Sequence, residues 1–330
     1  AQGVYFAAPT MATANGLLER TMNWARNTTE TGSVSSLYLA HSKNQLSKPY
    51  RELRFRDVNE DAFDLSSNGD VVASSWMSGR RRGLLSNIVV GTVDQVLMLA
   101  LRQPYSMLRH AALAGKIIIF DEIHSYGAYA SDYLATTLEW LAHYGATVIM
   151  MSATLPSAER EKLIEAYTGN PVNEHTEAYP LITVASESSL RYVTPGQSPT
   201  NLEARIKIVD DAIIALEELL EHLLIDGGVA LVICNTIARA QEAFSALTSD
   251  YPGEVELHHA GFMAWQRSEK EDRMRQELGP DSHRGEGRPW RKIVVATQVA
   301  EQSLDIDADV LVTDLCLLYT SPSPRDRQKS

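Results

Sequence analysis

The sequence predicts an α/β protein made of two parallel-sheet domains in tandem. Short apolar or β-branched runs alternate with longer stretches of helical spacing, and this alternation occurs on both sides of a Ser-, Pro- and Thr-rich segment near residue 200. Such alternation is typical of parallel strands connected by helices. We expect a first domain over 1–190, a linker over 191–204 and a second domain over 205–316.

Five apolar runs predict the strands of the first domain, at residues 4–8, 36–40, 88–90, 117–120 and 147–151. Small or polar residues follow each run. Helical spacing separates many of these runs, as in the stretch from Tyr133 to Tyr144, where Leu134, Leu138 and Leu141 recur on one face.

Four further runs predict the strands of the second domain, at residues 229–234, 255–257, 293–296 and 310–313. An amphipathic stretch precedes them, and its apolar positions are Ile206, Val209, Ile213, Leu216, Leu220 and Leu223. The spacing of these positions is that of an amphipathic helix.

Composition excludes several classes of protein. No apolar run approaches the roughly 18 to 20 residues that span a bilayer, so we expect a soluble chain without a membrane partner. Cys234 and Cys316 do not form a paired framework, which suits a reducing, cytoplasmic compartment. The net charge of -12 disfavours nucleic-acid binding by bulk electrostatics, although a local groove can be basic in an acidic protein.

Both ends of the chain depart from the pattern of a complete protein. The chain enters an apolar run within a few residues of Ala1, so we expect further sequence upstream. After Cys316 the regular pattern stops, and residues 317–330 are expected to be a disordered, non-native tail.

The most informative pattern is a strand that ends in two acids. The run at 117–120 is followed at once by Asp121-Glu122-Ile123-His124, and ligands of open parallel sheets bind beyond the carboxyl ends of the strands. A first acid there suits Mg²⁺ and a second suits the attacking water of nucleotide hydrolysis. The alternative is an acidic helix start, since Asp and Glu favour helix N-termini.

A second polar group follows the next predicted strand. Ser152-Ala153-Thr154 comes after the run at 147–151, which places two hydroxyls at the end of a neighbouring strand. The alternative is a helix cap ahead of Pro156, a role that Ser157 could also fill.

The two groups together resemble motifs II and III of superfamily-two helicases. Three further segments resemble the CRISPR-associated helicase-nuclease of type I systems, at residues 8–15, 90–95 and 295–307. The resemblance covers residues 4–316 and implies two RecA-like domains in tandem, both incomplete. It also implies an ATP-dependent translocase or helicase on single-stranded DNA in type I CRISPR interference. ATP and Mg²⁺ would be its cofactors, and its partners would be single-stranded DNA and a guide-RNA surveillance complex.

The resemblance assigns roles to individual residues. Asp121 would bind Mg²⁺, Glu122 would be the catalytic base, and His124 would couple the nucleotide state to Ser152, Ala153 and Thr154. Ser303 and Asp305 would contact the nucleotide. The nucleic-acid track would comprise Pro9, Thr10, Thr92, Gln95, Asn235, Thr236, His258 and Thr297, whose hydroxyls, amides and backbone groups can hold phosphates without reading bases.

Three departures from the family pattern limit this assignment. The sequence contains no Gly-x-x-x-x-Gly-Lys-Ser/Thr loop to bind phosphates, no His-Asp pair of a metal-dependent nuclease, and no arginine-rich motif shortly after Cys316. We therefore expect that this chain does not hydrolyse ATP by itself.

Other functions and simpler roles stay open. The chain could be another superfamily-two helicase or translocase, or a nucleotide-independent module that binds nucleic acid or a partner. Thr92 and Thr297 could be turn or cap residues. Trp76, Trp140 and Trp265 could stack on bases, although isolated tryptophans usually pack in a core or at its rim.

Overall fold

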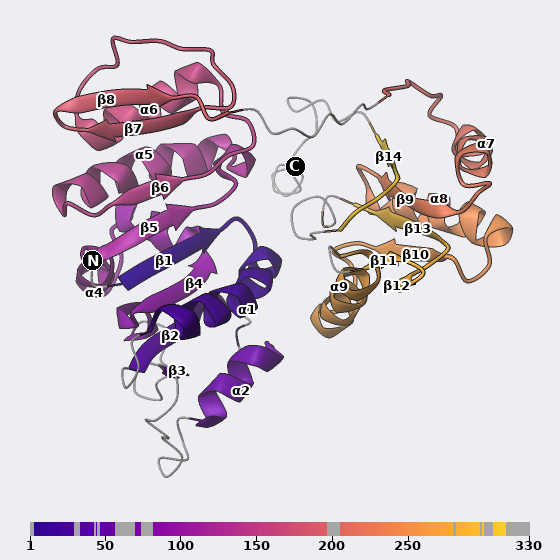
Figure 1. The fold of residues 1–330 in the computed structure, drawn as a ribbon, viewed down its shortest axis with the longest axis horizontal. Coiled ribbons are helices and arrows are strands. Elements are labelled where there is room, and N and C mark those ends of the chain that lie inside the picture. Colours follow the sequence, from indigo (N-terminus) through magenta and orange to yellow (C-terminus); the bar gives the residue numbers. More distant parts are fainter. Residues whose placement is uncertain are drawn as a thin grey trace, which may run out of the picture. The chain divides into compact units, whose positions relative to one another are not determined.

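The computed structural model describes residues 3–29, 34–42, 44, 47–56, 70–73, 82–196, 205–279, 282–297, 299 and 306–314. The chain divides into two compact units, Ala1–Asn201 and Leu202–Ser330. Figure 1 shows the first in indigo to red and the second in orange to yellow. Residues 315–330, which contain the predicted tail, lie outside the described part, and so do 197–204 of the predicted linker.

The first unit is built on a six-stranded sheet with the order β3-β2-β4-β1-β5-β6. Every pair of neighbours in it is parallel, as the sequence predicted. The strands are β1 (Gly3–Ala8), β2 (Val34–Ala40), β3 (Asp70–Val72), β4 (Ile88–Thr92), β5 (Lys116–Phe120) and β6 (Val148–Met150). Parallel strands need crossovers, and the intervening helices supply them.

Helices pack against this sheet and complete its core. They are α1 (Met11–Thr28), α2 (Lys48–Arg56), α3 (Asp94–Leu97), α4 (Ser106–Leu113), α5 (Ala128–His143) and α6 (Ser157–Thr168), with short 3₁₀ turns η3 (Arg82–Leu85), η4 (Met98–Ala100) and η5 (Ile123–Ser125). Tyr5 and Phe120 of the sheet and Leu138 and Leu141 of α5 are fully buried. The apolar spacing of 133–144 therefore marks the buried face of α5, as predicted.

An antiparallel hairpin ends the described part of the first unit. It consists of β7 (Ile182–Ser186) and β8 (Ser189–Val193), and β7 packs against α6. Residues 191–193, which the sequence assigned to the linker, are instead the end of β8. Alternate residues of each strand are exposed, among them Ile182, Val184 and Val193, and the sequence analysis predicted no strand here.

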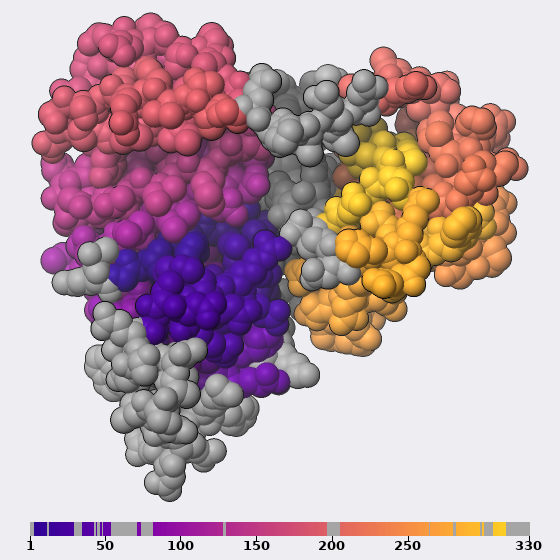
Figure 2. Space-filling view, in the orientation of Figure 1, coloured from indigo at the N-terminus to yellow at the C-terminus, as the bar shows by residue number. Residues whose placement is uncertain are grey.

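The second unit has a four-stranded parallel sheet with the order β10-β13-β9-β14. Its strands are β9 (Gly228–Ile233), β10 (Val255–His258), β13 (Arg291–Ala296) and β14 (Val310–Thr313), with a small pair β11 (His283–Arg284) and β12 (Gly287–Arg288). Its helices are α7 (Ile213–Leu223), α8 (Ile237–Asp250) and α9 (Ala264–Leu278). Figure 2 shows α9, in orange, at the surface of this unit.

The amphipathic stretch before this sheet is shorter than predicted. The helix begins only at Ile213, and Ile206 lies outside it with 95% of its surface exposed. Ile208, at 84%, is exposed as well, so residues 206–209 contribute nothing to the core. In the part of the chain that the structure describes, no helix is long and apolar enough to cross a membrane.

Candidate nucleotide and nucleic-acid sites

The backbone of the sheet places Asp121 at the carboxyl edge of the first unit. Its N–H donates to the carbonyl of Ala7 (3.0 Å), which continues the β1–β5 ladder one residue beyond β5. The hydroxyl of Tyr126 donates to the Asp121 carbonyl (2.9 Å) and holds it from the other side. The side chain is half-buried, and burial raises the pKa of Asp121, an effect that the Glu122 N–H and the nearby His124 partly offset.

The backbone of Glu122 is in the left-handed region, with φ of 53°. This conformation is uncommon for a residue with a Cβ and tends to occur at functional sites. Glu122 precedes the 3₁₀ turn η5, but its side chain makes no cap hydrogen bond there. Glu122 thus stands at the start of a short helical turn, as the alternative interpretation expected, but its carboxylate does not cap that turn. Its carboxylate lies instead 3.0 Å from Nε2 of His124.

His124 joins the acids to the polar group after β6. Its Nδ1 is 3.1 Å from Oγ of Ser152, and that hydroxyl donates to the carbonyl of Thr154 (2.7 Å). Because the Ser152 proton points to Thr154, its oxygen accepts from Nδ1–H of His124. A continuous polar chain thus runs from Glu122 through His124 to Thr154.

Ser152 and Thr154 do not cap a helix. The next helix, α6, begins at Ser157 with Pro156 in the cap position and no side-chain cap. Ser157 itself bonds to Glu177 (3.2 Å) rather than to the helix. β6 lies directly beside β5, so the predicted neighbouring strand is present and the hydroxyl group belongs to the edge that carries Asp121.

The donor set at this edge fits Mg²⁺ delivered with a nucleotide. No described side chain forms an ion pair with the Asp121 carboxylate, and carboxylate oxygen is a ligand that Mg²⁺ accepts. No group of three or more His, Cys, Asp and Glu side chains among the described residues could hold a metal by itself. Proteins often bind Mg²⁺ through one or two carboxylates, and nucleotide phosphates and water supply its remaining ligands. A single carboxylate at this edge matches that mode of binding.

The predicted track residues of the first unit follow two adjacent strands. Ala8 and Thr92 are partners across β1 and β4, which brings Pro9 and Thr10 near Thr92. Thr10 caps α1 by accepting from the N–H of Thr13 (3.1 Å), and Thr92 is buried. The structure therefore brings these residues together and also gives Thr10 a structural role.

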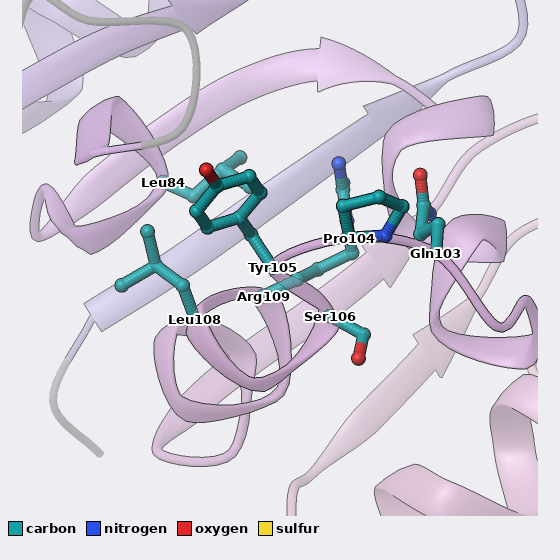
Figure 3. Close-up of a pocket in the computed structure, with 7 residues that line it drawn as sticks. All are labelled: Leu84, Gln103, Pro104, Tyr105, Ser106, Leu108 and Arg109. Atoms are coloured by element: carbon teal, nitrogen blue, oxygen red, sulfur yellow. The ribbon is translucent and has the colours of Figure 1, made fainter.

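Gln95 takes part in a contact that the sequence did not predict. Arg109 of α4 donates to the Gln95 carbonyl and lies 3.4 Å from its side-chain oxygen. Arg109 also lines a pocket of about 120 Å³ with Leu84, Gln103, Pro104, Tyr105, Ser106 and Leu108 (Figure 3). None of the predicted site residues lines this pocket.

The predicted track residues of the second unit follow three adjacent strands. Asn235 and Thr236 come after β9, His258 ends β10, and Thr297 comes after β13. The N–H of Thr297 donates to the carbonyl of His258 (3.1 Å), which fixes β10 and β13 at this edge. Thr236 caps α8 by accepting from the N–H of Arg239 (3.2 Å). The residues that the sequence analysis grouped into one track thus lie at the ends of adjacent strands in the fold.

His258 is fully buried, and both of its ring nitrogens lack a hydrogen-bond partner among the described residues. Burial lowers its pKa to about 4. Glu271 of α9 approaches Nε2 only to 3.9 Å. In this conformation the backbone of His258 forms part of the sheet edge, whereas its imidazole ring is buried.

The sequence analysis did not predict some of the contacts at these edges. Asp314, after β14, accepts from the Asn235 N–H (2.9 Å) and from Nε of Arg239 (2.9 Å). In the first unit the hydroxyl of Tyr179 donates to the carbonyl of Ala153 (3.1 Å). Both contacts join segments distant in sequence, and no local pattern signals them. Ser303 and Asp305 lie outside the described residues.

Comparison with known proteins confirms the predicted resemblance. Residues 226–320 match the family model of the CRISPR-associated nuclease/helicase Cas3, C-terminal. The chain is 38% identical to the CRISPR-associated nuclease/helicase Cas3 of Streptococcus thermophilus, over 95% of this chain and 34% of that protein. The chain thus spans about a third of the length of the relatives it matches.

Two solved structures extend the comparison to the fold. The T. fusca Cas3-ATP structure superposes with a TM-score of 0.78 at 31% identity, over 96% of this chain and 37% of that one. A chain of a CRISPR RNA-guided surveillance complex, pre-nicking, superposes with a TM-score of 0.62 at 26% identity, over 96% of this chain and 38% of that one. The predicted fold class, two RecA-like parallel-sheet domains in tandem, is confirmed.

Proposed function

We propose that this chain, which matches a third of the Cas3 nuclease/helicase, is the ATP-driven part of a translocase on single-stranded DNA in type I CRISPR interference. The observation that carries the proposal is the polar chain Glu122–His124–Ser152–Thr154 beside Asp121. It joins the ends of two adjacent strands of a parallel sheet, where nucleotide chemistry is expected in this fold class.

Asp121 and Glu122 have different roles in the proposed reaction. Asp121 holds Mg²⁺, which when bound neutralises charge on the nucleotide phosphates. Glu122 orients the attacking water and accepts its proton, as a positioned carboxylate does in general base catalysis. The contact with His124 fixes the Glu122 carboxylate and leaves it one oxygen for this task.

His124 links this chemistry to the polypeptide beyond it. A change in the charge or position of Glu122 alters the hydrogen bond at Nε2, and the ring transmits the change through Nδ1 to Ser152. Ser152 and Thr154 then pass it to the segment that Tyr179 contacts at Ala153. Glu122 and the segment around Ala153 are thereby coupled.

The nucleic-acid track consists of hydroxyl, amide and backbone groups at the carboxyl edges of both sheets. Thr10, Thr92 and Gln95 supply it in the first unit, and Asn235, Thr236 and Thr297 supply it in the second. Such groups suit phosphate oxygens and lack the bidentate geometry that reads bases. Sequence selection then comes from a guide-RNA surveillance complex, a proposal that the similarity to a chain of such a complex supports.

This chain spans about a third of the length of the nuclease/helicase relatives that it matches. The test therefore uses the full-length protein. Glu122→Gln should retain ATP binding and lower DNA-stimulated ATP turnover by about 10² to 10⁴, the range for removing a positioned base. Asp121→Asn should raise the Mg²⁺ concentration required for turnover.

Glu159→Gln provides a matched control, since Glu159 lies in the first turn of α6, outside the polar chain. It should hydrolyse ATP at the native rate. Native turnover by Glu122→Gln would refute the base assignment. Absence of ATP turnover in the native full-length protein would favour a nucleotide-independent binding module.

A further inference from the structure

The loop after β10 lies among the track residues of the second unit. It runs from His259 to Met263 and enters α9 at Ala264. Its first residue follows His258, whose carbonyl accepts from Thr297. A Cβ built on Gly261 would lie 3.9 Å from Cδ1 of Ile237, the residue after Thr236. The loop therefore borders the segments that follow both β9 and β13.

This loop and the first turn of α9 present large apolar side chains to solvent. Met263 is 61% exposed, and Trp265, in the first turn of α9, is 58% exposed. A tryptophan in a helix that packs on a sheet is ordinarily turned toward the core, because its burial is strongly favourable. An exposed indole near strand ends that carry hydroxyl and amide groups suits stacking on a nucleic-acid base, which is how proteins bind single strands without reading sequence.

Several contacts hold the loop in place. The rings of His259 and Phe262 stack with centroids 4.4 Å apart, and Lys270 of α9 lies 4.9 Å from the Phe262 centroid. The N–H of Gly261 donates to Nδ1 of His259 (3.1 Å). The N–H of Met263 donates to the side chain of Gln266 (3.1 Å). Trp265 thus stands on a preorganised support, which reduces the entropy lost when a ligand binds.

One cationic side chain of α8 and α9 differs from the others in its ion pairing. Arg239, Lys270, Arg273 and Arg275 each form an ion pair with a carboxylate. Arg267, two residues after Trp265, pairs with no described carboxylate, and its Nε is buried without a hydrogen-bond partner in the described structure. The charge of Arg267 acts on Glu271, one turn further along α9, but no contact among the described residues uses its terminal N–H donors, and such donors are suited to bind a phosphate.

We propose that the loop 259–263 and the first turn of α9 form a contact for one nucleotide of single-stranded DNA. Trp265 stacks on the base, and Arg267 binds the adjoining backbone phosphate. This inference rests on the proposed function and adds a contact of a different kind, since the track residues hold phosphates through hydroxyls and amides. Stacking tolerates any base, so it is compatible with movement along an arbitrary sequence.

The test measures binding of the 330-residue chain to two fluorescent strands, an oligothymidylate and an abasic strand of equal length. Trp265→Ala should weaken binding to oligothymidylate by roughly 5- to 100-fold, the range for one base–aromatic stack, and leave binding to the abasic strand unchanged. Trp265→Phe should restore most of the affinity. Trp290→Ala removes an indole that is 70% exposed and precedes β13, at the end of that β-strand away from Thr297, and this variant should bind both oligonucleotides as the native chain does.

Arg267→Ala should weaken binding to both strands and lower the slope of log K against log salt by about 0.7, the value for one phosphate contact on a single strand. Arg273→Ala removes a paired cation from the same helix and should change the slope less. Native affinity in both Trp265→Ala and Arg267→Ala would overturn this site alone, provided that Thr92→Val still weakens binding. A native chain that binds neither strand would overturn the proposed function, and this site with it.

Discussion

At the scale of single residues, the two acids have different environments, which supports the different tasks that we propose for them. The Asp121 carboxylate forms no ion pair with any described side chain, which leaves it open to a cation. Glu122 carries a strained backbone and a histidine partner, which together fix the direction of its carboxylate. Strain of this kind persists only where surrounding structure over-determines it, and here the β5 ladder and the His124–Ser152 bond do so.

The first residue-scale prediction concerns the link between His124 and Ser152. Their hydrogen bond means that removing either partner breaks the same path, so the two substitutions should not be additive. His124→Ala and Ser152→Ala should each lower DNA-stimulated ATPase of the full-length protein, and the double variant should lose little more. A double-mutant cycle checks this, with a coupling of about 0.5 to 3 kcal/mol expected for residues in contact. Additive losses would show that the contact has no role in the coupling.

The second residue-scale prediction concerns acid stability. His258 is buried and neutral, and its pKa of about 4 lies below the ordinary value of 6.5. The unfolded chain therefore binds a proton that the folded chain resists, and stability falls as the pH drops from about 6.5 to 4. His258→Leu should remove up to roughly 3 kcal/mol of this loss, the equivalent of the shift.

Urea unfolding at several pH values between 4 and 7 measures this effect. Lys270, Arg267, Glu256 and His259 act on the His258 ring by their charges. Burial raises the pKa of Glu271, whose contribution therefore has the opposite sign, and the difference between native and variant isolates His258. His222→Gln, at an exposed position of α7, should leave the pH profile unchanged. A native-like slope in His258→Leu would contradict the assignment.

At the scale of elements, the buried strands were predictable and the exposed ones were not. β4 and β9 are buried throughout, so their sequences are continuous apolar runs that any parallel sheet requires. β7 and β8 expose every second residue and pair with each other in a separate two-stranded sheet. The three-residue β3 is too short to show the two-residue alternation of a strand. The acidic pair was predictable because it follows a buried strand directly, whereas the Asp314–Arg239 contact depends on a fold that joins residues 75 apart.

The element-scale prediction separates the two roles of Thr236. Its side chain caps α8, so Thr236→Ala should lower stability by about 1 kcal/mol. Thr236→Asp retains a good cap and adds a negative charge, which should preserve stability but weaken DNA binding. Thr236→Ser should preserve both. Thermal unfolding and anisotropy on one oligonucleotide measure the two effects, and tight DNA binding by Thr236→Asp would remove this position from the track.

At the scale of the whole molecule, each unit repeats one arrangement. Adjacent parallel strands end in a hydroxyl or amide, and a threonine caps the helix that follows the first strand, Thr10 in one unit and Thr236 in the other. With a net charge of -12, the proposed binding to DNA would have to come from these local edges and not from the surface as a whole. The sequence showed the repeated pattern, but the uneven lengths of the crossovers hid how closely the two units correspond.

The last prediction is that DNA binding is largely independent of sequence, sensitive to salt and shared by both units. Thr92 and Thr297 are buried at the ends of β4 and β13, so valine keeps their volume and removes only the hydroxyl. Thr92→Val and Thr297→Val should each weaken binding by a similar factor on every single-stranded sequence, because a hydroxyl on a phosphate carries no base information. A motor must also release each nucleotide as it advances, and base contacts worth about 1 to 3 kcal/mol each would trap it.

Fluorescence anisotropy on several unrelated oligonucleotides at two salt concentrations measures both properties. Affinity should fall as salt rises, since phosphate contacts release counterions from the strand. Ser186→Ala, in the two-stranded β7–β8 hairpin and not in either parallel sheet, is a control that removes a hydroxyl and should bind as the native chain does. A strong preference for one oligonucleotide, or native binding in both valine variants, would show that the strand is held elsewhere, because hydroxyls that contribute no affinity cannot form the track.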